Sequence, residues 1–137
     1  MTRFTLEQAA AMAAAAQRRA AEIGIRVTVA VVDEGGHLVH LGRMDGAPPL
    51  TAEIAEAKAA GAATLGRPGD AVAEIYEKRP GFFEAIAEMT RRPLIPGLGS
   101  VLIRSEEHII GAIGVSGGRP EQDLDCAEAG LKAIGGA

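Results

Sequence analysis

Lys58 is the residue whose surroundings in the sequence point most directly to chemistry. A helix is predicted to begin at Thr51, and on it Lys58 shares a face with small and apolar residues, namely Ile54, Gly61, Ala62 and Leu65. A lysine on such a face is unfavourable to bury unless a partner accepts its hydrogen bonds. Two interpretations stay open. The ammonium reaches water or a structural carboxylate such as Asp33 or Asp45, or it holds an anionic ligand or polarises a substrate carbonyl.

The three histidines are the next candidates, and two of them are candidate ligands of haem iron. His37 and His40 are three residues apart on a predicted strand, so their side chains are expected on opposite faces and do not chelate one metal together. Either one can serve as an axial haem ligand, with the second ligand coming from another element or subunit. An ordinary structural role is the commoner alternative for each, and His108 is expected at a solvated rim. The sequence contains neither HxxxH nor HExxH, which argues against a dedicated non-haem metal site.

A glycine-rich segment at 114–120 has the form of a phosphate-binding loop that opens a helix. Glu121 and Asp123 in the first helical turn would repel a phosphate, and no P-loop lysine follows the glycines. Nucleotide binding is therefore not expected. The backbone that another ligand can approach here is that of Ser116, Gly117 and Gly118.

Charged residues near strand ends and loops form the last group of candidates. Arg43 and Asp45 flank a turn that follows a strand, a common place for ligand sites, although aspartate in such a turn often bonds its own backbone. Arg91 and Arg92 precede a loop rich in proline and glycine, where they can attract a carboxylate or simply remain solvated. The glycines of that loop that leave room for a ligand are Gly97 and Gly99.

The composition limits the classes of protein that can use these residues. The chain has 137 residues, a formal net charge of -4 and 47% hydrophobic residues, as expected for a single domain spanning 1–137. Its basic residues are scattered among 18 acids, which argues against nucleic-acid binding. No apolar run has the length of a membrane span, so no membrane partner is expected. The first residues lack a leucine-rich signal core, which predicts a cytoplasmic location, with an export signal outside these residues as the open alternative.

The predicted order of elements is helix, hairpin, helices, hairpin, helix. Helices are expected at 5–23, 51–65, 70–78, 81–89 and 120–134, and strands at 27–33, 37–44, 100–104 and 108–115. Thr5 and Gln8 have the form of a capping box at the start of the first helix. The segment 92–99 is expected to be a loop or a bulged edge strand. Because hairpins pair antiparallel, the predicted fold class is α+β, with helices packed on an antiparallel sheet.

Several segments of the chain form a pattern that is known from one family. They are the residues 31–38, 43–47, 55–59, 96–99, 111–118 and 121–123. With them the sequence resembles the GlcG/HbpS family of haem-associated proteins over nearly its whole length, and the C-terminal domain of PduO is similar to it. The resemblance implies profilin-like α-β-α layers around an antiparallel sheet of about five strands, commonly assembled into dimers, larger rings or octamers. It also implies haem as the cofactor to expect.

The sequence is compatible with two functions. The first is an oligomeric protein that binds haem or a related tetrapyrrole, with His37 or His40 as the iron ligand. The second is a small catabolic enzyme, an isomerase, hydratase or lyase, in which Lys58 holds or polarises an organic acid. The candidate acids and bases of such an enzyme are Asp45, Glu121 and Asp123. In either case the expected pocket is lined by Lys58, Arg43, Asp45, Gly97, Gly99, Ser116, Gly117 and Gly118.

Overall fold

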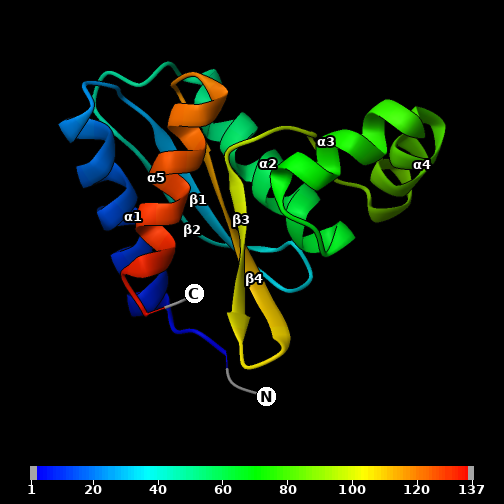
Figure 1. The fold of residues 1–137 in the computed structure, drawn as a ribbon, viewed down its shortest axis with the longest axis horizontal. Helices are drawn as coiled ribbons and strands as arrows, with labels where there is room; N and C mark the ends of the chain where they lie inside the picture. Colours follow the sequence, from blue (N-terminus) through cyan, green and yellow to red (C-terminus); the bar gives the residue numbers. More distant parts are fainter. Residues whose placement is uncertain (1–2, 136–137) are drawn as a thin grey trace.

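The computed structural model describes residues 3–135, and its elements follow the predicted order (Figure 1). They are α1 (Leu6–Glu22), β1 (Thr28–Asp33), β2 (Leu38–Arg43), α2 (Leu50–Leu65), α3 (Gly69–Lys78), α4 (Pro80–Thr90), β3 (Ser100–Ser105), β4 (His108–Ser116) and α5 (Pro120–Lys132). Among residues 3–135, no helix combines the length and the apolar character that crossing a bilayer requires.

The strands form one antiparallel sheet with the order β2-β1-β4-β3. The α+β fold class is thus confirmed, but the sheet has four strands and not about five. The segment 92–99 is a loop and adds no edge strand. Pro93 and Pro96 have no N–H to donate to a neighbouring strand, and Gly97 and Gly99 adopt φ angles of 151° and 109°, which β-strands do not use.

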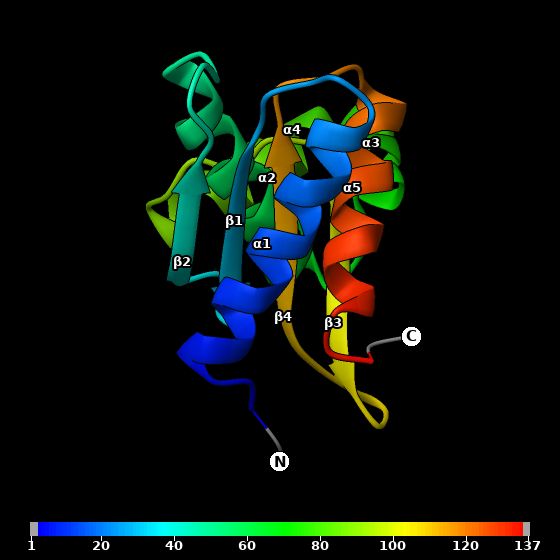
Figure 2. The same ribbon diagram turned by 90° about the vertical axis from the view of Figure 1, so that its left-hand side faces the viewer.

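Both faces of the sheet are buried along the central strands β1 and β4, which explains why β1 is apolar at nearly every position. Val29 and Val31 face α1 and α5, whereas Ala30 and Val32 face α2. Successive residues of a strand point to opposite faces, so a strand between two helical layers needs apolar residues at odd and even positions alike. Figure 2 shows α1 and α5 in front of the sheet and α2 behind it. The α-β-α layers are therefore confirmed.

α2 packs on the sheet through very small residues. A Cβ atom added at Gly114 of β4 would lie 2.2 Å from the carbonyl oxygen of Ala55 and 2.7 Å from the backbone nitrogen of Ala59. Ala30 and Ala112 line the same interface. The bare backbone at Gly114 therefore sets how closely α2 approaches the sheet.

The start of α2 differs from the prediction that Thr51 caps it. The helix begins at Leu50 with Pro49 in the cap position, so Thr51 already lies inside the first turn. Its hydroxyl donates to the carbonyl oxygen of Pro48 at 2.6 Å and lies 2.9 Å from the hydroxyl of Thr28. Because the Thr51 hydrogen is directed at Pro48, Thr28 is the donor to Thr51. This buried pair of hydroxyls ties α2 to β1.

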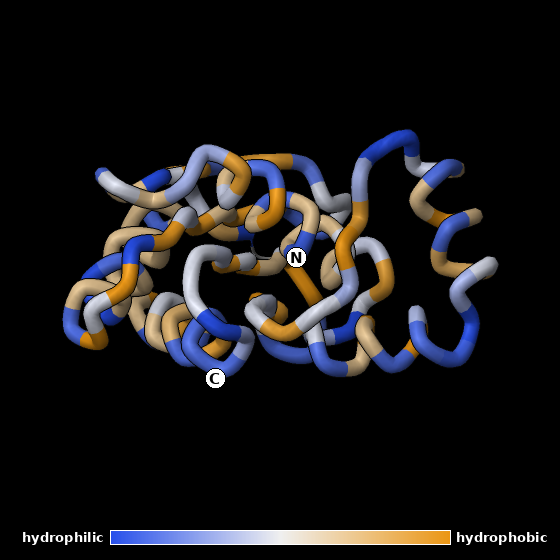
Figure 3. Tube along the Cα trace, turned by 90° about the horizontal axis from the view of Figure 1, so that it is seen from above, coloured by the Kyte–Doolittle hydropathy of each residue, from blue (hydrophilic) through white to orange (hydrophobic). Residues whose placement is uncertain are grey.

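α3 and α4 form a helical arm that projects from the body, at the right of Figure 1. In Figure 3 the same arm, again at the right, alternates hydrophobic and hydrophilic residues. Phe83 anchors the arm by packing with Ala60 of α2 and Leu94 of the following loop. Phe82 and Met89 of α4 remain exposed. The arm thus carries apolar side chains on its outer surface as well as on its inner one.

Candidate functional site

Lys58 lies in a polar cluster at the end of β4, where α2 and α5 come together. Its Nζ donates to a carboxylate oxygen of Asp123 at 3.1 Å and to the carbonyl oxygen of Val115 at 3.0 Å. The second carboxylate oxygen of Asp123 accepts from the Gly118 N–H at 2.8 Å. The Lys58 and Asp123 side chains are 11% and 4% exposed. Lys58 thus has a structural carboxylate, as one interpretation of the sequence required, but its partner is Asp123.

The Lys58–Asp123 pair is closely enclosed. A Cβ atom added at Gly99 would lie 3.0 Å from the Nζ of Lys58 and 2.9 Å from the Cβ of Asp123. Burial raises the pKa of Asp123 above its ordinary value, while the Gly118 N–H and the Lys58 ammonium both favour the charged form. The two side chains satisfy each other, and together they join α2, β4 and α5.

Only some residues of the expected pocket come together in the structure. Gly99 and Gly118 meet around Lys58, together with Asp123, which was a candidate acid or base and not an expected pocket residue. Glu121 is exposed and pairs with Arg119 at 2.8 Å, a hydrogen bond that holds the pKa of Glu121 below its ordinary value. Asp45 is exposed and borders a shallow hollow beside α1. Of the others, Arg43 is exposed at the end of β2, Ser116 is buried at the end of β4, Gly117 packs on the backbone of Arg26, and Gly97 lies in the loop before β3.

The two candidate haem ligands lie on different parts of the first hairpin. His37 belongs to the turn and not to the strand as predicted, because β2 begins one residue later. A side-chain oxygen of Asp33 holds this turn by accepting from the N–H groups of Gly35 and His37, each at 2.9 Å. The His37 side chain is exposed. His40 lies on β2 opposite Val31, which places it on the face that α1 covers.

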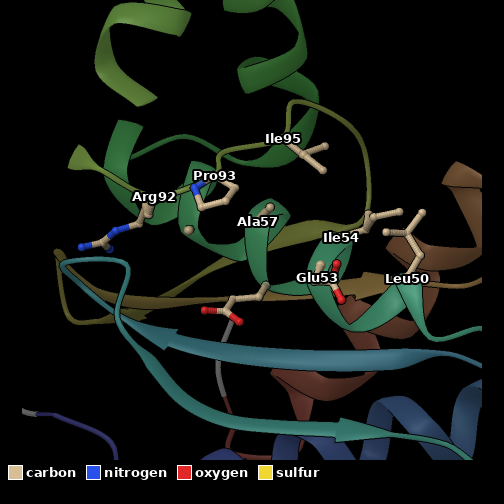
Figure 4. A pocket seen from close by; sticks show the side chains of 9 residues that line it. Leu50, Glu53, Ile54, Ala57, Arg92, Pro93 and Ile95 are labelled. Carbon is tan, nitrogen blue, oxygen red and sulfur yellow. The ribbon is translucent and has the colours of Figure 1, made fainter. Parts of the chain in front are cut away.

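An apolar cleft of about 350 Å³ runs along the side of α2 that points away from the sheet (Figure 4). We call it the α2 cleft. Its lining residues are Leu50, Glu53, Ile54, Glu56, Ala57, Ala60, Arg92, Pro93 and Ile95. The residues from α2 recur at helical spacing and form one wall, and the loop before β3 forms the other. The volume of the α2 cleft lies in the range of small-molecule sites.

Arg92 stands at one end of the α2 cleft and links its loop to the turn between β1 and β2. Its Nη1 donates to the carbonyl oxygen of Gly35 at 2.5 Å, and its Nη2 lies 3.4 Å from the Nδ1 of His37. The residue is half-buried, and in Figure 4 its side chain extends from the cleft toward the turn. The sequence does not predict this cleft. The sequence feature that could have pointed to the cleft is the pair Arg91 and Arg92 before a loop rich in proline and glycine.

Comparison with known proteins agrees with this architecture. Residues 4–132 match the family described as haem degrading protein HbpS-like. Protein GlcG of Escherichia coli strain K12 is 38% identical over 112 residues, which cover 80% of this chain and 78% of GlcG.

Solved structures show the same fold. A double mutant of HbpS from Streptomyces reticuli superposes with a TM-score of 0.88 at 29% identity, covering 98% of this chain and 89% of that chain. A complex of PduOC with haem superposes with a TM-score of 0.86 at 24% identity, covering 99% of this chain and 98% of that chain. With its sequence matched from residue 4 to residue 132, the chain belongs to the HbpS-like family.

Proposed function

We propose that the protein binds haem or a related tetrapyrrole in the α2 cleft. The observation that carries the proposal is the meeting of three features in one place. An apolar cleft, the guanidinium of the partly buried Arg92 and the exposed imidazole of His37 adjoin one another. The family description as haem degrading and the haem complex of PduOC support the same ligand.

The residues of the α2 cleft fit such a ligand in kind. A tetrapyrrole needs apolar surface for its ring, cations for its carboxylates and, when it holds iron, an axial ligand. Ile54, Pro93 and Ile95 supply apolar surface, and Arg92 supplies the cation. Of the two candidate histidines we propose His37 as the iron ligand, because it lies beside Arg92 whereas His40 lies on the α1 side of the sheet. When bound, haem iron would contribute ligand-binding and redox chemistry.

The enzymatic alternative has less support from the geometry. The Lys58 ammonium is engaged by Asp123 and Val115, so it is not presented to an organic acid. In the described part of the chain, the other candidate acids and bases, Asp45 and Glu121, form no hydrogen bond or ion pair with Lys58 or Asp123. The arrangement around Lys58 therefore favours a structural role for that residue.

We also propose that the protein self-associates into a dimer or a higher oligomer. Phe82 and Met89, seven residues apart and therefore on one face of α4, are 44% and 75% exposed, and exposed apolar side chains that gather on a surface often mark contacts between proteins. Sedimentation equilibrium tests the proposal. A species larger than 14.1 kDa is expected, and a monomer at every concentration would overturn it.

Titration with haemin, followed by its Soret absorption, tests the proposed ligand. Saturable binding is expected, and its absence would overturn the proposal. His37→Ala should move the Soret maximum and weaken haemin binding roughly tenfold or more. Loss of a residue that only supports a metal ligand already weakens metal binding by about that factor. His40→Ala is the matched control and should behave like the parent. A Soret band that responds to His40→Ala and not to His37→Ala would reassign the iron ligand.

A further inference from the structure

Arg92 differs from the other basic residues of the chain in its surroundings. Among residues 3–135, three lysine or arginine residues are partly buried: Arg19, Lys58 and Arg92. Arg19 pairs with Asp125 at 3.0 Å, and Lys58 pairs with Asp123 at 3.1 Å. Within the described part of the chain, Arg92 has no carboxylate within salt-bridge distance. A half-buried cation without an anion is unfavourable, so this site suits an anion that arrives with a ligand.

The charges of the α2 cleft are also distributed unevenly along it. The guanidinium lies near the C-terminal half of α2, because Arg92 Nη1, Thr64 Oγ1 and Ala60 O surround the vacant Cβ position of Gly36 at 2.5, 3.1 and 3.6 Å. Glu53 and Glu56, the two glutamates that line the cleft, lie seven and four residues before Ala60, about 10 and 6 Å away along the helix axis. Figure 4 shows Arg92 at one end of the cleft and Glu53 near the other. A ligand with carboxylates on one edge fits this gradient in one orientation.

The current partners of Arg92 leave it free to take up a carboxylate. A guanidinium has five N–H donors, and the contacts with Gly35 and His37 use two of them. The contact with Gly35 fixes the direction of the side chain. The contact with His37 is long, at 3.4 Å, and it requires Nδ1 to be unprotonated and hence Nε2 to carry the hydrogen. A neutral His37 that binds iron through Nε2 carries its hydrogen on Nδ1, so it cannot accept from Arg92 at the same time.

We infer that Arg92 binds the ligand carboxylates, so that a tetrapyrrole lies with its carboxylate edge toward Arg92 and its hydrocarbon edge toward Leu50. This inference rests on the proposed function. The Nη2 hydrogen bond that Arg92 donates to His37 is then donated to the carboxylate instead, while the hydrogen bond to Gly35 keeps the guanidinium in place. The ligand class is therefore a flat apolar ring with carboxylates on one edge.

Titration with iron-free protoporphyrin IX and with its dimethyl ester, in the same detergent buffer, tests the role of Arg92 without any contribution from iron. The parent should bind the diacid about tenfold or more tightly than the ester, as expected for a hydrogen bond between charged groups. Arg92→Ala should bind both porphyrins with the affinity that the parent shows for the ester. Arg92→Gln, which keeps a donor for Gly35 without the charge, should give the same result and separates loss of charge from disruption of the turn. Arg91→Ala is the matched control, since Arg91 is exposed, and it should retain the preference of the parent.

The outcomes separate this inference from the proposed function. Equal affinity of the parent for the diacid and the ester would overturn the role of Arg92 and leave tetrapyrrole binding intact. The role of Arg92 would likewise be overturned if Arg92→Ala and Arg92→Gln both still bound the diacid more tightly than the ester. No saturable binding of haemin or of either porphyrin would overturn the proposed function, and this inference with it.

The orientation has a test of its own. Coproporphyrin III carries carboxylates around the ring and would bring one toward Glu53 and Glu56. We expect the parent to bind it a few-fold more weakly than protoporphyrin IX, and the double variant Glu53→Gln, Glu56→Gln to remove that difference, since partly exposed charges have a modest effect. Equal binding of both porphyrins by the parent would show that the ligand is not oriented by this gradient.

Discussion

Replacing Lys58 with methionine is expected to lower the free energy of unfolding by about 3–5 kcal/mol. Methionine keeps most of the length and apolar surface of the side chain but removes the ammonium. The carboxylate of Asp123, only 4% exposed, then keeps the Gly118 N–H but loses the opposite charge. Domains of this size are stable by about 5–15 kcal/mol, so this loss is a large share of the total. Urea denaturation measures it directly.

Two further variants show whether the loss comes from the buried charge. Lys78→Met removes a pair with Glu74 whose side chains are 71% and 69% exposed, and it should change stability by less than about 0.5 kcal/mol. Adding Asp123→Asn to Lys58→Met should recover much of the loss, because asparagine still accepts from Gly118 but carries no charge. A double variant no more stable than Lys58→Met would contradict the explanation.

The effect of Lys58→Met should also depend on pH. Without the ammonium, the pKa of Asp123 rises further above its ordinary value than burial already places it. A folded-state pKa above the unfolded value means that the folded protein binds the proton more tightly, so stability falls as pH rises through the raised pKa. The difference in free energy of unfolding between Lys58→Met and the parent should therefore be full at neutral pH and shrink in acid.

A Lys58→Met variant that keeps its stability but loses haemin binding would show instead that Lys58 contacts the ligand.

Features that depend on neighbours in the chain were predictable from the sequence. The capping box is present, with Thr5 and Gln8 exchanging hydrogen bonds of 2.8 and 3.0 Å. Gly66 ends α2 in the left-handed conformation, as a glycine at that place predicts. Thr51 shows the limit of such reasoning, because a threonine can cap a helix or lie inside its first turn. In the structure Thr51 lies inside the first turn of α2, where its hydroxyl meets that of Thr28, a buried residue of β1.

The site was less predictable because its contacts join distant parts of the chain. Lys58 and Asp123 are 65 residues apart, and no spacing rule selects Asp123 over Asp33 or Asp45. Arg92 likewise reaches a turn 57 residues earlier in the chain. Such pairings follow from the layering of helices on the sheet, which brings the ends of several elements together.

The positions of His37 and His40 were hard to predict for a local reason, an irregularity in the first hairpin. Opposite faces were expected for His37 and His40 from strand periodicity, but that rule applies only inside a regular strand. The pairing of β1 with β2 shifts register between Val31 and Val32, and the turn ends only after His37. A single irregularity of this kind redirects every side chain on one side of it.

Gly114→Val is expected to destabilise the fold by roughly 3 kcal/mol or more, the upper end of the range for overpacked sites. The new Cβ would lie 2.2 Å from the carbonyl oxygen of Ala55, whereas real Cβ atoms essentially never come closer than 3.0 Å. The obstructing atoms belong to the backbone of α2, so no side-chain rotation relieves the clash and the helix must move away from the sheet. Since α2 also forms one wall of the α2 cleft, the folded fraction should bind haemin more weakly than the parent. Urea denaturation and haemin titration measure the two effects.

Gly81→Ala is the matched control for Gly114→Val, because no heavy atom outside its immediate neighbours lies within 4 Å of a Cβ added there. It lies in α4 at a backbone conformation that alanine adopts freely, so it should raise the free energy of unfolding by about 0.4–1 kcal/mol. Opposite signs for the two glycine substitutions would show that close approach of α2, and not glycine content as such, determines the geometry of the sheet and the cleft. A Gly114→Val variant as stable as the parent would mean that α2 can lie farther from the sheet at little cost in free energy, and that the α2 cleft is not fixed by this contact.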